Sequence, residues 1–171
     1  MGQDSPARNF DTHSDYEINP LDVVEAVLGS RRYAYDRGAD FELTLFSGGK
    51  WTDYQLGFSY LPESEGLQLT LIFDPRIPAA RNTEIMRLLA LMNAQNWLGH
   101  FDYLDEERAI LFRCGIPLRG AQLSEAQCED MIDLTLEACE TFFPALQYVL
   151  WAGMSASDAL AACMLETKGE A

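Results

Sequence analysis

The sequence predicts an α+β domain in which an antiparallel five-stranded sheet carries helices packed on one face, in the order α-β-β-β-α-β-β-α-α. The 171 residues, 48% of them apolar, are enough to bury a single core. Apolar residues recur at helical spacing near both ends of the chain and in its middle. Between these helices, apolar and polar residues alternate as in strands with one buried face, over residues 41–45, 54–60, 67–73 and 100–114.

The first helix is predicted to begin at Pro20, because Asn19 can cap its first turn and proline fits the first helical position. An apolar stripe that includes Leu21 and Val24 continues the helix. Gly29 is a suitable terminator.

Three antiparallel strands then follow, joined by turns in the SGGK and PESEG segments. A second helix is predicted over residues 79–97, and Gly99 is expected to end it. Asn93 and Asn96 lie on the inner side of this helix, where we expect them to bond to neighbouring backbone groups.

Residues 100–115, HFDYLDEERAILFRCG, combine a histidine, an aspartate and a cysteine, as catalytic and metal-binding sites do. A hairpin about DEER explains them better, because a two- or four-residue loop sets apolar residues opposite each other and His100 opposite Arg113. In this register Cys114 points into the core, on the face opposite His100 and Asp102. No nucleophile with a visible base and no phosphate-binding glycine loop occurs elsewhere, so we expect no catalytic residue, no metal and no cofactor.

The C-terminal third is predicted to be helical. Ser124 and Gln127 form a capping-box pattern, and one apolar stripe then runs for about seven turns. Pro144 is expected to kink or restart this helix, and a last short helix begins at Ser155 after Gly153. Four aromatic residues of this region are expected to pack in the core: Phe142, Phe143, Tyr148 and Trp151.

Residues 1–17 are polar and without periodicity, which predicts a disordered N-terminal tail. A single domain over residues 18–167 and a C-terminal tail over residues 168–171 complete the predicted chain. No apolar run approaches the ~20 residues of a membrane helix, and the N-terminus lacks the features of a secretory signal. We therefore expect a soluble, cytoplasmic protein.

The composition restricts the partners. With a net charge of −15, the surface repels phosphates and anionic lipids, so neither nucleic acid nor a membrane is expected to bind. The cysteines include no C-x-x-C pair and are expected to be buried hydrophobic residues: Cys114, Cys128, Cys139 and Cys163.

The chain resembles the YbjN family of bacterial proteins in the pieces PLDVVEAVL, YLPESEGLQLTLIFDPRIP, LLALMNAQNWLGHFDYLDEERAILFRCGIPL and FFPALQYVLWAGMSASDALAA, over about residues 19–166. The resemblance implies the fold of type III secretion chaperones, which are often dimeric, and a role in regulating sensory transduction. Relatives with this fold bind unfolded protein segments without catalysis. The most specific piece contains Asn93, Gly99, Phe101, Asp102 and Arg113.

A non-catalytic, protein-binding regulator or chaperone-like module is the function that these observations favour. The alternatives are a small-molecule sensor with a pocket between sheet and helices, and an enzyme with an unrecognised acidic site. The sheet face opposite the helices would mix large apolar with charged residues, as interfaces do. We predict that a protein partner or a second copy binds there through Phe46, Trp51, Ile72, Leu104, Leu111 and Arg113.

Overall fold

The computed structural model describes residues 19–73 and 76–169, with side chains up to residue 165. This part of the chain contains four α-helices, α1 Pro20–Ser30, α2 Asn82–Asn93, α3 Glu125–Leu150 and α4 Ala156–Gly169. It also contains six strands, β1 Ala34–Arg37, β2 Glu42–Gly48, β3 Asp53–Leu61, β4 Gly66–Ile72, β5 His100–Leu104 and β6 Ala109–Pro117. The predicted N-terminal tail lies outside the described residues, and α4 continues two residues into the predicted C-terminal tail.

The six strands form one antiparallel sheet in the order β1-β2-β3-β4-β6-β5. The α+β class and the antiparallel pairing are therefore as predicted, but the prediction of five strands was wrong. The sequence of β1, AYDR, has no apolar alternation, and none of its four residues is buried in the structure. Antiparallel backbone pairing with β2 makes this segment a strand, and ion pairs from Arg37 to Asp22 and Glu25 connect it to α1. Neither contact leaves an alternating apolar pattern in the sequence.

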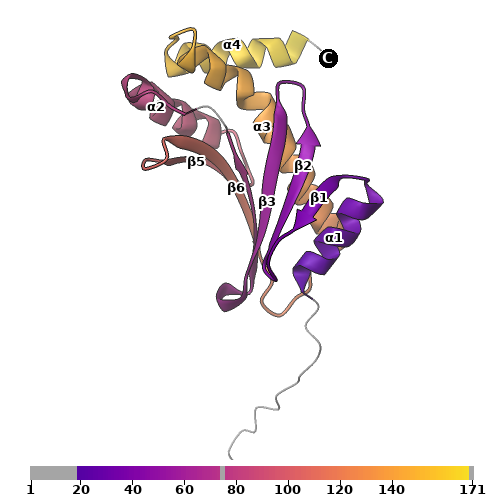
Figure 1. The fold of residues 1–171 in the computed structure, drawn as a ribbon. Helices are drawn as coiled ribbons and strands as arrows, with labels where there is room; N and C mark the ends of the chain where they lie inside the picture. Colours follow the sequence, from indigo (N-terminus) through magenta and orange to yellow (C-terminus); the bar gives the residue numbers. More distant parts are fainter. Residues whose placement is uncertain (1–18, 74–75, 170–171) are drawn as a thin grey trace, which may run out of the picture.

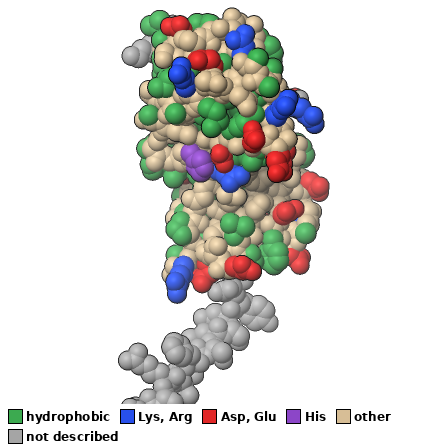
Figure 2. Space-filling view, turned by 90° about the vertical axis from the view of Figure 1, so that its left-hand side faces the viewer, with side chains coloured by type: hydrophobic (Ala, Val, Ile, Leu, Met, Phe, Trp, Pro, Cys, Tyr) green, Lys and Arg blue, Asp and Glu red, His purple; other side chains and the backbone are tan. Residues whose placement is uncertain are grey.

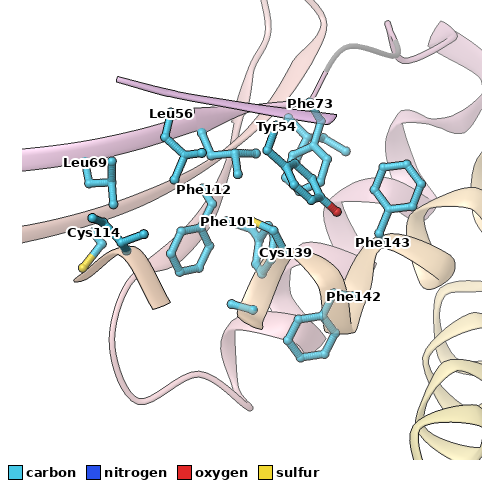
Figure 3. Close-up of a cluster of buried hydrophobic side chains, with 14 of the residues drawn as sticks. Tyr54, Leu56, Leu69, Phe73, Phe101, Phe112, Cys114, Cys139, Phe142 and Phe143 are labelled. Atoms are coloured by element: carbon cyan, nitrogen blue, oxygen red, sulfur yellow. The ribbon is translucent and has the colours of Figure 1, made fainter. Parts of the chain in front are cut away.

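Helices α1 and α3 lie on one face of the sheet, and α4 packs on α2 and α3 at one end of the molecule (Figure 1). The core between α3 and the sheet is rich in aromatic rings (Figure 3). The ring centroid of Phe101 lies 4.9 Å from that of Phe112 and 5.7 Å from that of Phe142, in edge-to-face contacts. None of the helices within the described ranges is long and apolar enough to cross a bilayer.

The helix boundaries are partly as predicted. Asn19 caps α1, since its side chain accepts a hydrogen bond from the N–H of Leu21. Gly29, however, lies inside α1, and the chain turns after Ser30.

The second helix is shorter than predicted. It ends at Asn93 instead of reaching Gly99, because the Asn93 amide pairs with the backbone of Phe101 on β5. Its Oδ1 accepts the Phe101 N–H at 2.7 Å, and its Nδ2 donates to the Phe101 carbonyl at 2.9 Å. Gly99 makes the turn into β5 with φ +74°, where a Cβ would strike the ring of Phe112. The expectation that Asn93 bonds to backbone is thus confirmed, and the pairing occupies part of the free edge of β5.

The predicted hairpin is confirmed. His100 pairs with Arg113 and Asp102 with Leu111, across a four-residue loop. Cys114 is buried in the core, whereas His100 is exposed on the opposite face. The histidine and the cysteine therefore do not form a common site.

The long helix α3 runs without interruption through Pro144, so the predicted restart there is wrong. Its N-terminus has the predicted capping box, with Ser124 and Gln127 bonded reciprocally. Ser155 caps α4 by accepting a hydrogen bond from the N–H of Asp158 at 3.2 Å.

We predict that none of the four cysteines reacts with a thiol-specific disulfide reagent in the native protein at pH 8. All four are buried, and burial raises the pKa of Cys114, Cys139 and Cys128, the last to about 12, so their thiols stay protonated. All four should react once guanidinium unfolds the chain. Rapid labelling of any one cysteine in the native protein would contradict the burial of that side chain in the core.

Candidate binding groove

The face of the sheet opposite α1 and α3, called here the outer face, is the first candidate surface. No helix within residues 19–73 and 76–169 covers Phe46 and Ile72 on this face, which are 46% and 57% exposed. Figure 2 views the molecule from this side and shows apolar side chains scattered among charged and polar ones. The face is thus partly apolar and open, as the sequence predicted.

The sheet splits at one end of this face. Strand β3 pairs with β2 over Asp53–Ser59, but its pairing with β4 starts only at Leu56. Strand β4 ends at Ile72, and the next residue, Phe73, donates its N–H to the carbonyl of Ile110 instead. The tip of the β2–β3 hairpin therefore stands apart from β4 and β6, as Figure 1 shows.

A groove of about 750 Å³ occupies this split. It runs from the outer face to the C-terminal end of α3, and its floor on the sheet consists of small or polar residues. We call it the groove; its lining residues are Trp51, Thr52, Asp53, Tyr54, Gln55, Gly57, Ser59, Thr70, Ile72, Phe73, Phe143, Gln147 and Trp151.

Trp51, in the β2–β3 turn, is fixed to α3 by a hydrogen bond that depends on a proline. Because Pro144 has no N–H, the carbonyl four residues earlier, that of Glu140, cannot accept the usual helical hydrogen bond. The indole Nε1–H of Trp51 donates to this carbonyl at 3.2 Å. A proline inside α3 thus provides the acceptor that holds one wall of the groove.

The carboxylate of Glu140 holds the same turn. Its Oε1 accepts the backbone N–H of Lys50 at 2.8 Å. The turn comes so close to α3 that a Cβ on Gly49 would overlap both this carboxylate and the ring of Tyr54. Only glycine fits at this position without moving the turn.

Tyr54 places a buried hydroxyl beside Glu140, and Figure 3 shows this hydroxyl pointing away from the sheet toward Phe143. The hydroxyl makes no hydrogen bond within the described residues, although the side chain is only 4% exposed. Burial, with the negative charge of Glu140 nearby, raises the pKa of Tyr54 above its usual value. The groove therefore keeps this tyrosine neutral.

The structure brings together only some of the predicted partner-binding residues. Trp51 and Ile72 line the groove, and Phe46 lies next to it, opposite Gln55 in the sheet. Leu104 is half-buried at the end of β5, away from the groove.

Two further predicted residues are less available than expected. Leu111 does face outward but is only 2% exposed, so it offers little surface to a partner in this structure. Arg113 is half-exposed, and its Nη1 lies 3.9 Å from Oδ2 of Asp102, in the ion pair that the hairpin register predicted. An ion pair this exposed contributes about 0–1 kcal/mol.

Trp151 is a groove residue that the sequence analysis missed. Phe142 and Phe143 are buried, as predicted, but Trp151 is 65% exposed. It lies just after the last residue of α3, where the apolar stripe no longer determines which way a side chain points. Gly153, which turns the chain with φ +69°, was the signal that the helix had ended before this tryptophan.

The groove suits binding, because it offers aromatic rings, two glutamine amides and one carboxylate within reach of one another. By contrast, the cavity between the sheet and α3, lined by Phe73, Ile110 and Leu146 among others, measures about 10 Å³. That volume is room for about one water molecule. The predicted alternative of a ligand pocket between sheet and helices therefore has no space at this position.

Comparison with known proteins identifies a family that the chain matches. The family model "YbjN: Putative bacterial sensory transduction regulator" matches residues 20–148. A search of curated proteins finds no significant match. Among solved structures, "Crystal structure of YbjN, a putative transcription regulator from E. coli" is similar with a TM-score of 0.52 and 11% identity, over 70% of this chain and 85% of that one. The "Crystal Structure of the ExsC-ExsE Complex" gives a TM-score of 0.46 and 18% identity, over 59% and 72%.

We predict that the Trp51 hydrogen bond and Pro144 are energetically coupled. Trp51→Phe should lower the free energy of unfolding by about 1 kcal/mol, because it leaves the Glu140 carbonyl without its partner. In a Pro144→Ala background the new backbone N–H can satisfy that carbonyl, so the same change should cost less. Urea unfolding of the four proteins measures the coupling, and strictly additive effects would contradict it.

We also predict that Tyr54→Phe reduces the alkaline sensitivity of the fold. Tyrosine in the unfolded chain ionises near its usual pKa of about 10, whereas Tyr54 in the folded chain does so only at higher pH. This contribution to stability is present below pH 10 and is lost as the pH rises further. The melting temperature of Tyr54→Phe should therefore fall less than that of the wild type between about pH 9 and about pH 11. Parallel curves over this range would refute the role of Tyr54.

Proposed function

Because the chain belongs to the YbjN family, as its resemblance predicted, we propose that it is a non-catalytic, protein-binding regulator that holds a polypeptide segment on the outer face of its sheet. The observation that carries the proposal is the groove, together with the exposed apolar residues that continue from it. Ile72 lies at the groove and Phe46 beside it, and both keep about half of their surface in water. A partner that covers them gains free energy in proportion to the apolar area that it buries.

The floor of the groove favours an extended segment. Gly57, Ser59 and Thr70 carry small side chains, so another backbone can approach the sheet closely there. From Asp53 to Ser59, strand β3 advances about 20 Å, which matches an extended segment of about six or seven residues.

A small-molecule sensor is the second candidate, and the volume of the groove supports it. About 750 Å³ lies within the range of about 300–1,000 Å³ that is usual for ligand pockets. A polypeptide is favoured because exposed apolar surface extends past the groove to Phe46. A metabolite panel distinguishes the two, since a specific small ligand raises the melting temperature in proportion to its occupancy.

The absence of catalysis is part of the proposal. Three of the four thiols have a raised pKa and are buried, which makes them poor nucleophiles. His100 is paired with Arg113 in the sheet and lies on the face opposite Cys114, so the two side chains cannot act together.

We predict that Ile72→Glu greatly reduces binding of protein partners while leaving the fold intact, because it places a charge where an apolar contact is needed. Leu165→Glu is the matched control, since Leu165 on α4 is 73% exposed and away from the groove. Tagged full-length proteins are recovered from native cells and their partners are quantified by mass spectrometry, with circular dichroism as the check of folding.

The outcomes of this experiment are distinct. Partners lost with Ile72→Glu and kept with Leu165→Glu support the proposal. Equal recovery with both variants, or no partner on the wild type, would refute it. Light scattering of the same proteins tells whether the partner is a second copy.

A further inference from the structure

We propose that the groove selects segments in which a lysine or arginine is flanked by apolar residues. This inference rests on the proposed function and specifies the chemistry of the segment. Three features support it: the charge of the groove lining, the two tryptophans in that lining, and the positions of the basic residues near the groove.

The lining carries one formal charge, and it is negative. Asp53 is exposed at the start of β3, and the groove is lined by no lysine, arginine or histidine. Tyr54, the other titratable lining residue, is neutral at neutral pH, because burial raises its pKa above the ordinary value of about 10. A cationic side chain in the groove therefore meets an attractive carboxylate, and a carboxylate of the partner would meet a repulsive one.

Two tryptophans line the same groove as this carboxylate, and an indole face is the aromatic surface on which a cation binds best. Trp51 and Trp151 both line the groove and are 39% and 65% exposed. A lysine or arginine within about 6 Å of an indole face is attracted by the electrons of the ring. On Trp51 the ammonium of Lys50 already lies 4.9 Å from the ring centroid, so a cation of the segment would use the indole of Trp151.

Two other bases lie near the groove, and neither lines it. Arg113, opposite Thr70 in the sheet, has its Nη1 3.9 Å from Oδ2 of Asp102. The guanidinium of Arg81 lies against Gly153, in the loop after α3, where a Cβ on the glycine would come within 2.8 Å of Nη2. It does not line the groove. The net charge of −15 adds a long-range attraction for a basic segment, which speeds its encounter with the protein.

The apolar part of the segment follows from the remaining lining. The remaining large apolar residues of the lining are Ile72, Phe73 and Phe143. An extended chain that sets its cation against Asp53 and Trp151 places the neighbouring side chains over Ile72. Apolar neighbours bury this residue, whereas polar ones leave it in contact with water.

The test uses a library of random nonapeptides displayed on phage and panned on the folded full-length chain. The expected result is enrichment of peptides with a lysine or arginine next to apolar residues. The strongest binder is synthesised with its basic residue kept, or replaced by norleucine or by glutamate. We expect affinity to fall in that order, by about fivefold or more at each step.

Matched variants of the protein locate the interaction. Asp53→Asn should weaken the basic peptide about fivefold, whereas Asp130→Asn, which removes an equal charge from exposed α3 surface, should not. Trp151→Ala should weaken it, and Trp97→Ala, at an 80% exposed indole outside the groove, should not. Asp53→Lys should prefer the glutamate peptide.

The inference and the proposed function fail in different ways. Suppose that the selected peptides compete with one another on the wild type and no longer bind to Ile72→Glu. If these peptides lack a basic residue, or if Asp53→Asn leaves their affinity unchanged, the inference is overturned and the proposed function stands. Equal weakening by Asp53→Asn and Asp130→Asn also overturns it, because the attraction would then come from net charge alone. Binders that are unaffected by Ile72→Glu overturn both.

Discussion

The hydrogen bond from the Trp51 indole to the Glu140 carbonyl is the contact on which the groove depends. It exists because Pro144 leaves that carbonyl without a helical partner in the middle of a long helix. The Glu140 carboxylate reinforces it through the N–H of Lys50, and Gly49 provides the space. A backbone group that would be unsatisfied in an isolated helix thus ties the tip of a hairpin to α3.

This hydrogen bond explains how the tip of the β2–β3 hairpin stays in place although it does not pair with β4. The tip of the β2–β3 hairpin has no contact with β4 through backbone pairing beyond Leu56, so it needs support from elsewhere. Helix α3 gives that support on the core side, and the opposite side of the split opens as the groove. The same helix buries Phe142 and Phe143 one turn away, so the stability of the core and the shape of the groove share one element.

Strand faces and strand register could be predicted from the sequence, because the periodicity of apolar residues determines them. Features that depend on single contacts could not be predicted in this way. Alternation placed Cys114 and His100 on opposite faces and set the β5–β6 register, because a slip of one residue would bury charge. It could not find β1, which is held by backbone pairing with β2 and by the ion pairs of Arg37 with α1, nor the end of α2, which one Asn93 amide decides.

The candidate site was predictable in part for the same reason. Ile72 and Phe46 follow from alternation, whereas Trp151 lies beyond the helix that would have oriented it. Leu111 faces outward as alternation predicts, yet its neighbours bury it. Pro144 had a visible signal, since a proline within a helical stripe frees the carbonyl four residues earlier, but the partner of that carbonyl, Trp51, is 89 positions from Glu140 in sequence.

The most direct test of the account uses the indole N–H signals of the three tryptophans in the NMR spectrum of the full-length chain. On addition of a bound segment, here the selected nonapeptide, the account predicts that the signals of Trp51 and Trp151 shift together. The Trp97 signal should stay in place, because its indole lies outside the groove. A shift of Trp97 with Trp51 and Trp151 unmoved would contradict the account.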